Sequence, residues 1–117
     1  MYQVTFSDQS MGELNRLPIE IQMPIIEAFS ALTARDLHHA TGVLGRFERD
    51  KRVYYRLRAG DYRIYFEVIG DELYSHFILH RHTLADFIFR MKLPYTEESL
   101  LERDQSFWDY LEGLSKH

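Results

Sequence analysis

In the stretch YYRLRAGDYRIYFEV, residues 54–68, apolar or aromatic side chains alternate with mostly charged ones on both sides of the triplet AGD. Successive side chains of a strand point to opposite faces, so this pattern predicts two strands, and the glycine of the triplet predicts the turn between them. Extending the alternation along the chain gives one almost wholly apolar face, formed by Val53, Tyr55, Leu57, Tyr62, Ile64, Phe66, Val68, Leu73, Phe77 and Leu79. The opposite face collects Tyr54, Arg56, Arg58, Arg63, Tyr65, Glu67, Tyr74, His76 and His80.

The segments around this hairpin predict the rest of an α+β fold. Residues 44–49 and 72–80 continue the two-residue period, and the opening YQVTF at 2–6 has the composition of a further strand. Residues 8–17 and 18–32 carry apolar side chains at helical spacing. We therefore expect an αα-hairpin packed on the apolar face of an antiparallel sheet.

The end of the chain is helical in pattern. The segment TLADFIFRMK is expected to form a short helix that Thr83 caps and Pro94 stops. Residues 96–114 place apolar residues among acidic ones and predict one further, C-terminal helix. This helix docks either on the body of the protein or on a second copy of the chain, with Phe107 and Trp108 as the central anchors of the dimer.

Composition narrows the class of protein. A chain of 117 residues has room for one hydrophobic core, and the absence of cysteine excludes disulfide scaffolds, thiolate metal sites and a cysteine nucleophile. The net charge is -4, but residues 43–92 carry ten basic and seven acidic residues, so the positive charge is concentrated in the predicted sheet. No leader-like segment and no run of 18 apolar residues is present, so we expect a cytoplasmic protein that does not enter a membrane.

The polar face of the sheet has the residue types that RNA chemistry requires. Guanidinium groups bind phosphate oxygens in pairs and stabilise a pentacoordinate phosphorane. The phosphate-binding candidates are Arg56, Arg58, Arg63 and Arg81. Aromatic rings stack on unpaired bases, and RNA contacts are expected from Tyr54, Arg58, Tyr65, Tyr74 and His76. The imidazole of His80 or His82 can deprotonate a 2′-hydroxyl or protonate a leaving 5′-oxygen, and this chemistry requires no metal or other cofactor.

The same residues have plainer explanations. The solvated face of any antiparallel sheet carries arginine, glutamate and tyrosine, and a cross-strand pair accounts for Arg63 and Glu67 without a function. The imidazoles of His76, His80 and His82 form a zinc-like set, although their spacing matches no ligand motif. The sequence lacks the glycine-rich phosphate loop, the G-x-G-x-x-G fingerprint and the G-x-S-x-G elbow, which disfavours nucleotide-cofactor enzymes and serine hydrolases.

The run YYRLRAGDYRIYFEV, preceded by LNRLPIEIQMPIIEAF and followed by FILHRHTLADFIFR, resembles the RelE/ParE superfamily of toxins from type II toxin–antitoxin pairs. The likeness covers roughly residues 2–92 and implies a βααβββ core. For RelE-like members it implies ribosome-dependent, metal-independent cleavage of messenger RNA in the ribosomal A site. A 2′-hydroxyl attacks the adjacent phosphate and leaves a 2′,3′-cyclic phosphate, which represses translation. The resemblance also implies a role in plasmid stabilisation.

The resemblance assigns roles to individual positions. Relatives hold catalytic basic residues at the positions of Arg56 and Arg63 on the sheet and of Arg81 at the end of the last strand. Tyr54 replaces a basic residue, and Phe87 replaces a tyrosine that some members use in acid–base work. Other relatives use a histidine near the end of the domain, a role for which the candidates are His80 and His82.

The resemblance leaves the target and the last residues open. It divides the chain into a RelE-like toxin domain, 1–93, and an acidic helical extension, 94–117. A RelE-like nuclease would have an antitoxin, the ribosome and messenger RNA as partners. A ParE-like inhibitor of DNA gyrase and a non-catalytic binding module are also compatible with the sequence, as is a homodimer through the C-terminal helix. The net charge of -4 is unexpected for a protein that binds the ribosome.

Overall fold

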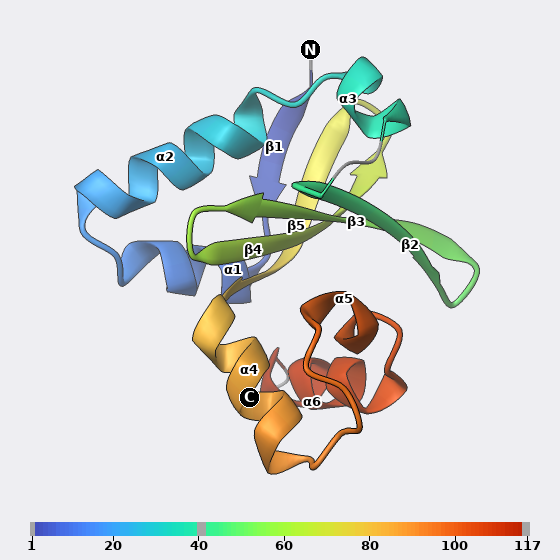
Figure 1. Ribbon diagram of the computed structural model, residues 1–117. Coiled ribbons are helices and arrows are strands. Elements are labelled where there is room, and N and C mark those ends of the chain that lie inside the picture. The colour runs from blue at the N-terminus through green and yellow to red at the C-terminus, as the bar shows by residue number, and fades with distance from the viewer. Residues whose placement is uncertain (1, 40–41, 116–117) are drawn as a thin grey trace. The chain divides into compact units, whose positions relative to one another are not determined.

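The computed structural model describes residues 2–39 and 42–115 (Figure 1). The elements follow in the order β1 (Gln3–Phe6), α1 (Asp8–Asn15), α2 (Ile19–Ser30), α3 (Ala34–His38), β2 (Leu44–Arg49), β3 (Arg52–Ala59), β4 (Tyr62–Ile69), β5 (Glu72–His80), α4 (Arg81–Arg90), α5 (Glu98–Leu101) and α6 (Gln105–Ser115). The chain divides into two compact units, residues 1–79 and 80–117. The domain boundary expected after residue 93 stays a prediction. No helix in the described part of the chain is long and apolar enough to cross a membrane.

The five strands form one sheet in the order β1-β5-β4-β3-β2. Strand β3 pairs antiparallel with both β2 and β4, as the sequence predicts, whereas β1 pairs parallel with β5, with Val4 opposite Leu73. The α+β class is therefore confirmed, and the expectation of a purely antiparallel sheet is wrong at this one edge. Parallel pairing needs a long connection, and here three helices and three strands lie between the two partners.

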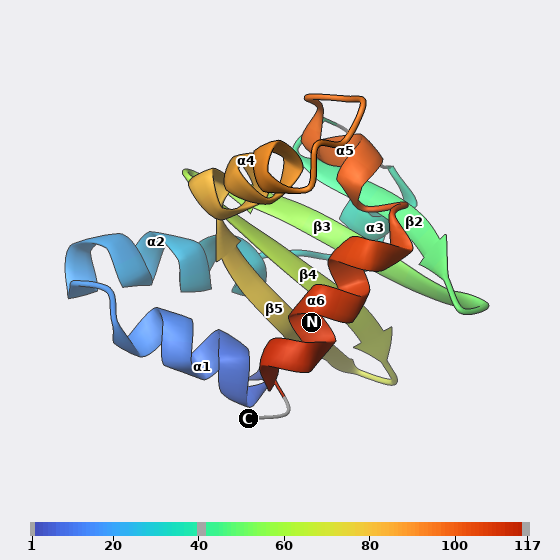
Figure 2. The same cartoon turned by 90° about the horizontal axis from the view of Figure 1, so that it is seen from below.

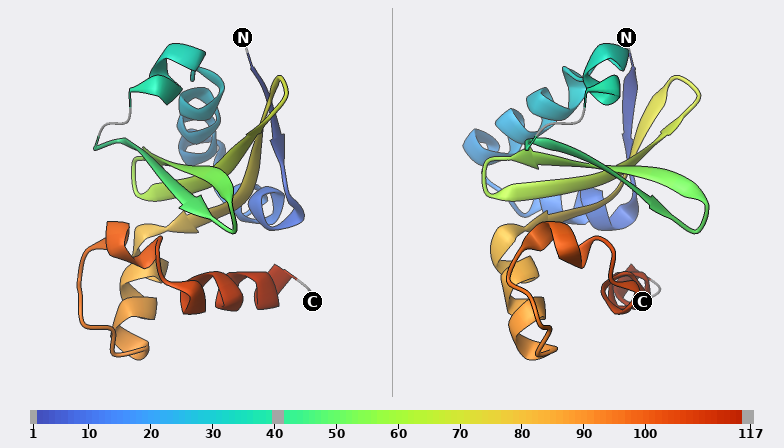
Figure 3. Two further views of the ribbon diagram at one scale, coloured as in Figure 1. Left: turned by 90° about the vertical axis from the view of Figure 1, so that its right-hand side faces the viewer. Right: turned by 45° about the vertical axis from the view of Figure 1, so that its right-hand side comes forward.

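The helices α1, α2 and α3 lie on one face of the sheet, and their apolar side chains form the core there (Figure 3). Phe29 of α2 is fully buried and meets the ring of Phe66 edge-on, with the two centroids 5.1 Å apart. Leu57, Ile64 and Phe66 are buried in this core, as their alternation predicts. Each large apolar side chain buried in this way contributes about 1.5–3 kcal/mol before conformational entropy opposes it.

The first two helices form the predicted hairpin (Figure 2). Ser7 caps α1, because its side chain accepts a hydrogen bond from the backbone N–H of Ser10 at 3.1 Å. Helix α2 contains Pro24 in its interior and still runs as one element from Ile19. The sequence does not predict α3, a five-residue helix that begins with a capping box between Thr33 and Asp36.

The alternation of β5 is interrupted near its end. Leu73 and Ile78 both belong to the helix-covered core, although residues five apart point to opposite faces of a regular strand. The side-chain amide of Gln9 accepts from the N–H of Ile78 at 2.9 Å and donates to its carbonyl at 3.0 Å. Phe77 and Leu79 are buried but lie outside this core, so their predicted place in it is wrong.

The second unit holds the last three helices. Helix α4 begins at Arg81, and its cap is His80 rather than the predicted Thr83, because Nδ1 of His80 accepts from the N–H of His82 at 3.1 Å. The C-terminal segment forms two helices, α5 and α6, instead of one.

The aromatic residues of α6 are buried. The ring of Phe107 meets that of Phe87 with the centroids 5.3 Å apart, and Nε1 of Trp108 donates to the carbonyl of Glu102 at 2.8 Å. Phe107 and Trp108 have exposed fractions of 1% and 2%. They are therefore not the exposed anchors that a homodimer through these two rings requires.

Candidate functional site

The face of the sheet that does not carry α1, α2 and α3 has five arginines. In the observed register Arg58 lies directly opposite Arg63, and Gly45 lies opposite Arg56. Alternation from these pairs places on one face, called here the arginine face, the side chains of Arg49, Arg52, Arg56, Arg58 and Arg63. Strands β2–β4 contribute one carboxylate to it, Glu67. Like charges directly opposite each other are destabilising, and negatively charged groups offset this repulsion.

Arg56 lies across the neighbouring strand β2 because Gly45 has no side chain. A Cβ atom at position 45 would lie 2.9 Å from Cζ of Arg56 and closer still to its Nη2. A real Cβ atom essentially never makes contacts this short, so the guanidinium occupies the space that any other residue at position 45 would fill. Gly45 thus determines where the charge of Arg56 is held.

Arg63 is fixed by the turn that joins β3 and β4. Its Nη1 donates to the carbonyls of Gly60 at 3.0 Å and Tyr62 at 3.1 Å. Gly60 has a φ of 61°, a backbone conformation that favours glycine, so the AGD triplet both turns the chain and orients one of these carbonyls. Arg58, opposite Arg63, is exposed.

Much of the arginine face is buried, although its alternation alone predicts a solvated surface. Arg56 and Arg63 have exposed fractions of 5% and 8%, and Tyr65 is fully buried. Tyr54 is also buried and stacks on Phe47 with the centroids 5.9 Å apart. Burial raises the pKa of the Tyr54 hydroxyl, and the charge of Glu67 raises it further. The expectation that Tyr54 and Tyr65 present open rings to RNA bases is therefore not met.

Glu67, the carboxylate of this face, binds two neighbours. Arg52 donates to it through Nε at 3.1 Å and through Nη2 at 2.5 Å, and Nε2 of His76 lies 2.7 Å from Oε1. Tyr74 meets the ring of His76 edge-on, with a centroid distance of 4.7 Å. The cross-strand pair expected between Arg63 and Glu67 is replaced by these contacts.

The remaining predicted catalytic residues lie at the start of the second unit. The rings of His80 and His82 are 4.7 Å apart, and Arg81 between them is the first residue of α4. Phe87, at the position where relatives have a tyrosine, is buried in the same helix. The predicted residues thus form two sets, one on the arginine face and one at the start of α4. In the described part of the chain, no three histidine, aspartate or glutamate side chains are placed to hold a metal ion.

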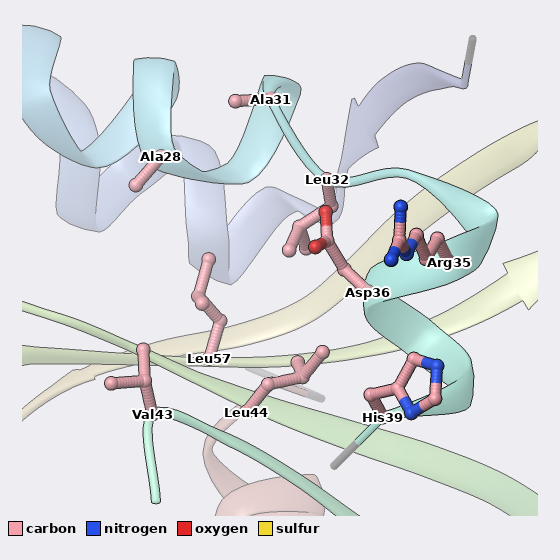
Figure 4. Close-up of a pocket in the computed structure, with 9 residues that line it drawn as sticks. All are labelled: Ala28, Ala31, Leu32, Arg35, Asp36, His39, Val43, Leu44 and Leu57. Carbon is pink, nitrogen blue, oxygen red and sulfur yellow. The ribbon is translucent and has the colours of Figure 1, made fainter. Parts of the chain in front are cut away.

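A groove of about 440 Å³ lies between α2, α3 and the strands β2 and β3 (Figure 4). Its apolar lining consists of Ala28, Ala31, Leu32, Val43, Leu44 and Leu57. Its polar residues, all contributed by α3 or the residue that follows it, are Arg35, Asp36 and His39. An apolar floor with charged residues beside it is suited to an amphipathic segment of a protein partner.

Comparison of the sequence with protein-family models gave no match, and comparison with curated proteins gave none. The structure resembles a chain of the toxin–antitoxin complex RelBE2 from Mycobacterium tuberculosis, with a TM-score of 0.53 and 21% identity over 68% of this chain and 98% of that one. It also resembles a chain of the archaeal RelE–RelB complex from Pyrococcus horikoshii, with a TM-score of 0.56 and 22% identity over 68% and 94%.

A chain of the YoeB–YefM complex from Staphylococcus aureus matches with a TM-score of 0.54 and 14% identity, over 68% of this chain and 97% of that one. The protein has a RelE-like toxin fold. About a third of the chain lies outside the part that these structures match.

Sequence reasoning missed several residues of the arginine face of this RelE-like fold. Gly45 and Arg49 are placed on it by the register of β2 against β3, which the sequence does not determine, whereas Arg52 shares the alternation of Arg56 and Arg58 and was overlooked. The signal for Gly45 was a glycine inside a strand pattern, which often marks the close approach of another group. The contact between Glu67 and His76 joins two strands, and alternation gave only their common face.

Proposed function

We propose that the protein is the toxin of a type II toxin–antitoxin pair and that it cleaves messenger RNA on the ribosome. The observation that carries this proposal is the arginine face, where strands β2–β4 bring together five guanidinium groups in a chain of net charge -4. A cluster of guanidinium groups on one face attracts a polyanion, and guanidinium groups fit the phosphates of a nucleic acid. The RelE-like fold, whose solved neighbours come from toxin–antitoxin complexes, supports the choice of reaction.

The residues divide the reaction between them. Arg56 and Arg63 bind the non-bridging oxygens of the scissile phosphate and stabilise the charge that develops when the 2′-oxygen attacks. The groups that would hold the flanking RNA are Arg58 and His76, since Tyr54 and Tyr65 are buried. His80, Arg81 and His82, which belong to the second unit, stay sequence-based predictions for phosphate binding or proton transfer. The product is a 2′,3′-cyclic phosphate, formed by side chains without a cofactor.

The proposed partner is an antitoxin, which would hold the toxin inactive in the cytoplasm, where the ribosomes are. The groove between α2, α3 and β2 supports this partner, because its apolar floor suits one face of an amphipathic helix. An antitoxin that also covered the arginine face would need acidic residues, because it would replace the phosphates there.

Induced expression in bacterial cells tests the proposed function. The expected result is growth arrest with a rapid loss of protein synthesis while DNA stays intact. DNA damage with unimpaired translation would instead support a ParE-like inhibitor of gyrase, and normal growth would support a non-catalytic binding module. The loss-of-function variant is the double substitution Arg58→Ala and Arg63→Ala. It removes the opposed pair of charges, and cells that express it should grow normally.

A further inference from the structure

His76 and Glu67 form a hydrogen-bonded pair on the arginine face. Nε2 of His76 lies 2.7 Å from Oε1 of Glu67, a short distance for a bond between nitrogen and oxygen. The Glu67 side chain has an exposed fraction of only 8%, whereas that of His76 is 25% exposed. The carboxylate is therefore buried, and the imidazole is the more exposed partner of the pair.

The partners of Glu67 determine which nitrogen of His76 carries the proton. Arg52 donates two hydrogen bonds to Glu67, so this group is an ionised carboxylate, which only accepts hydrogen bonds. Nε2 of His76 must then be the donor, and in the neutral imidazole Nδ1 keeps its lone pair. Nδ1 has no hydrogen bond to any residue of 2–39 or 42–115, so it is available to accept a proton.

The surroundings of His76 fix its ring. Tyr74 contacts it edge-on at 4.7 Å between centroids, and Tyr54 lies at 5.4 Å in a tilted arrangement. Its titratable contacts include Glu67, Tyr54 and Tyr74, and Arg52 donates to the same carboxylate. An imidazole held between two rings and a carboxylate has a defined orientation, as general bases in active sites do.

We propose that His76 is the general base of the reaction and that Glu67 is its positioning residue, an inference that rests on the proposed cleavage of RNA. Nδ1 takes the proton of the 2′-hydroxyl while the 2′-oxygen forms its bond to phosphorus. The bond between phosphorus and the 5′-oxygen breaks, and the 5′-oxygen leaves with a proton from solvent. The imidazolium then releases its proton to water. Arg56 and Arg63, on the same face, bind the phosphate oxygens.

Single-turnover cleavage of a messenger RNA on programmed ribosomes tests this role. His76→Ala should lower the rate by ~10²-fold or more, the contribution of a positioned general base. Added imidazole should restore part of that rate, because the substitution leaves space where the ring stood. His76→Gln keeps a hydrogen-bond donor for Glu67 and should be as slow, but without rescue. The matched control, His38→Ala, removes an exposed histidine of α3 and should cleave at the original rate.

Glu67→Gln separates positioning from binding. It should lower the rate of the bound complex by roughly tenfold and leave the affinity for the ribosome unchanged, because Glu67 acts through His76. Melting temperatures identify variants that fold, and only folded variants are compared.

The outcomes separate the two proposals. Failure of the unaltered protein to cleave overturns the proposed function and this role with it. If the unaltered protein cleaves the message, and folded His76→Ala and His76→Gln cleave it within about threefold of the same rate, the proposed function stands and the role of His76 is overturned. Loss of rate in folded His76→Ala that imidazole does not restore overturns it as well, because a structural residue gives that result.

Discussion

Arg56 owes its position to the residue beside it rather than to its own hydrogen bonds alone. The guanidinium lies in the space above Gly45, which a Cβ atom would enter at 2.9 Å from Cζ. The atoms that must yield are at the end of a flexible side chain, so Gly45→Ala should move the charge without unfolding the protein. We expect cleavage of messenger RNA on ribosomes to fall at least tenfold, because phosphate binding depends on position.

The control for this substitution is Gly42→Ala, which lies outside the strands. Both variants should melt within a few degrees of the unaltered protein. If Gly45→Ala cleaves at the original rate, the placement of Arg56 over β2 has no part in the reaction.

At the scale of residues, sequence reasoning found the charges but not their environment. Alternation alone placed Arg56, Arg58 and Arg63 on a common face, and the register confirms it. It predicted exposed side chains there, whereas Arg56 and Arg63 are buried. The difference arises because burial depends on which tertiary contacts cover a face, and a period of two carries no information about them.

The start of α6 contains a hydrogen-bonded group that makes the stability of the second unit depend on pH. Asp104 accepts hydrogen bonds from the N–H and the hydroxyl of Ser106 and from the hydroxyl of Tyr95. The hydrogen bond from Ser106 lowers the pKa of Asp104, and that from Tyr95 lowers it further. Burial, together with the bond to Asp104, raises the pKa of Tyr95 to about 12.

The two shifts act at opposite ends of the pH range. A lowered carboxyl pKa contributes stability that is present above the unfolded value and is lost as pH falls through the folded one, so the second unit should weaken in acid. A raised phenol pKa contributes stability that is present below pH 10 and is lost as pH rises toward about 12. Trp108, the single tryptophan, lies in α6, so its fluorescence during urea unfolding measures both losses.

Two substitutions test the assignment. Asp104→Ala should flatten the acid side of the profile and cost about 1 kcal/mol near neutrality, as loss of a helix cap does. Tyr95→Phe should flatten the alkaline side. An alkaline loss of stability that persists unchanged in Tyr95→Phe would show that another group causes it.

At the scale of elements, the periodicity of apolar residues predicted those helices and strands that the local sequence determines. The hairpin of α1 and α2 and the strands β2–β5 were predicted, as was their apolar face apart from Phe77 and Leu79. The errors fall where a distant residue decides. The parallel pairing of β1 and the bond of Gln9 to Ile78 join segments about seventy residues apart, and neither leaves a mark on the local sequence. The capping of α4 by His80 was missed because histidine is not a favoured cap.

The molecule as a whole has an uneven charge, with an acidic total and a sheet face that carries five arginines. The proposed antitoxin would engage the first unit through the groove beside α2. Ala31→Lys places a charged chain in that groove and should weaken co-purification with the antitoxin at least tenfold.

Ser30→Lys is the matched control, because it adds the same charge one residue away, outside the groove lining. Equal antitoxin retention by both variants would place the antitoxin elsewhere on the chain. The growth arrest caused by the free toxin should be the same in both variants, since neither residue lies on the arginine face.

The most direct test of the proposed function is the mapping of RNA ends after purified protein is added to ribosomes with a defined codon in the A site. We predict cleavage within that codon, no cleavage of the same RNA without ribosomes, and a rate at least ~10²-fold lower for Arg63→Ala, the loss typical when a group that stabilises transition-state charge is removed. An intact message after incubation with the unaltered protein, or equal cleavage by a folded Arg63→Ala variant, would contradict the account.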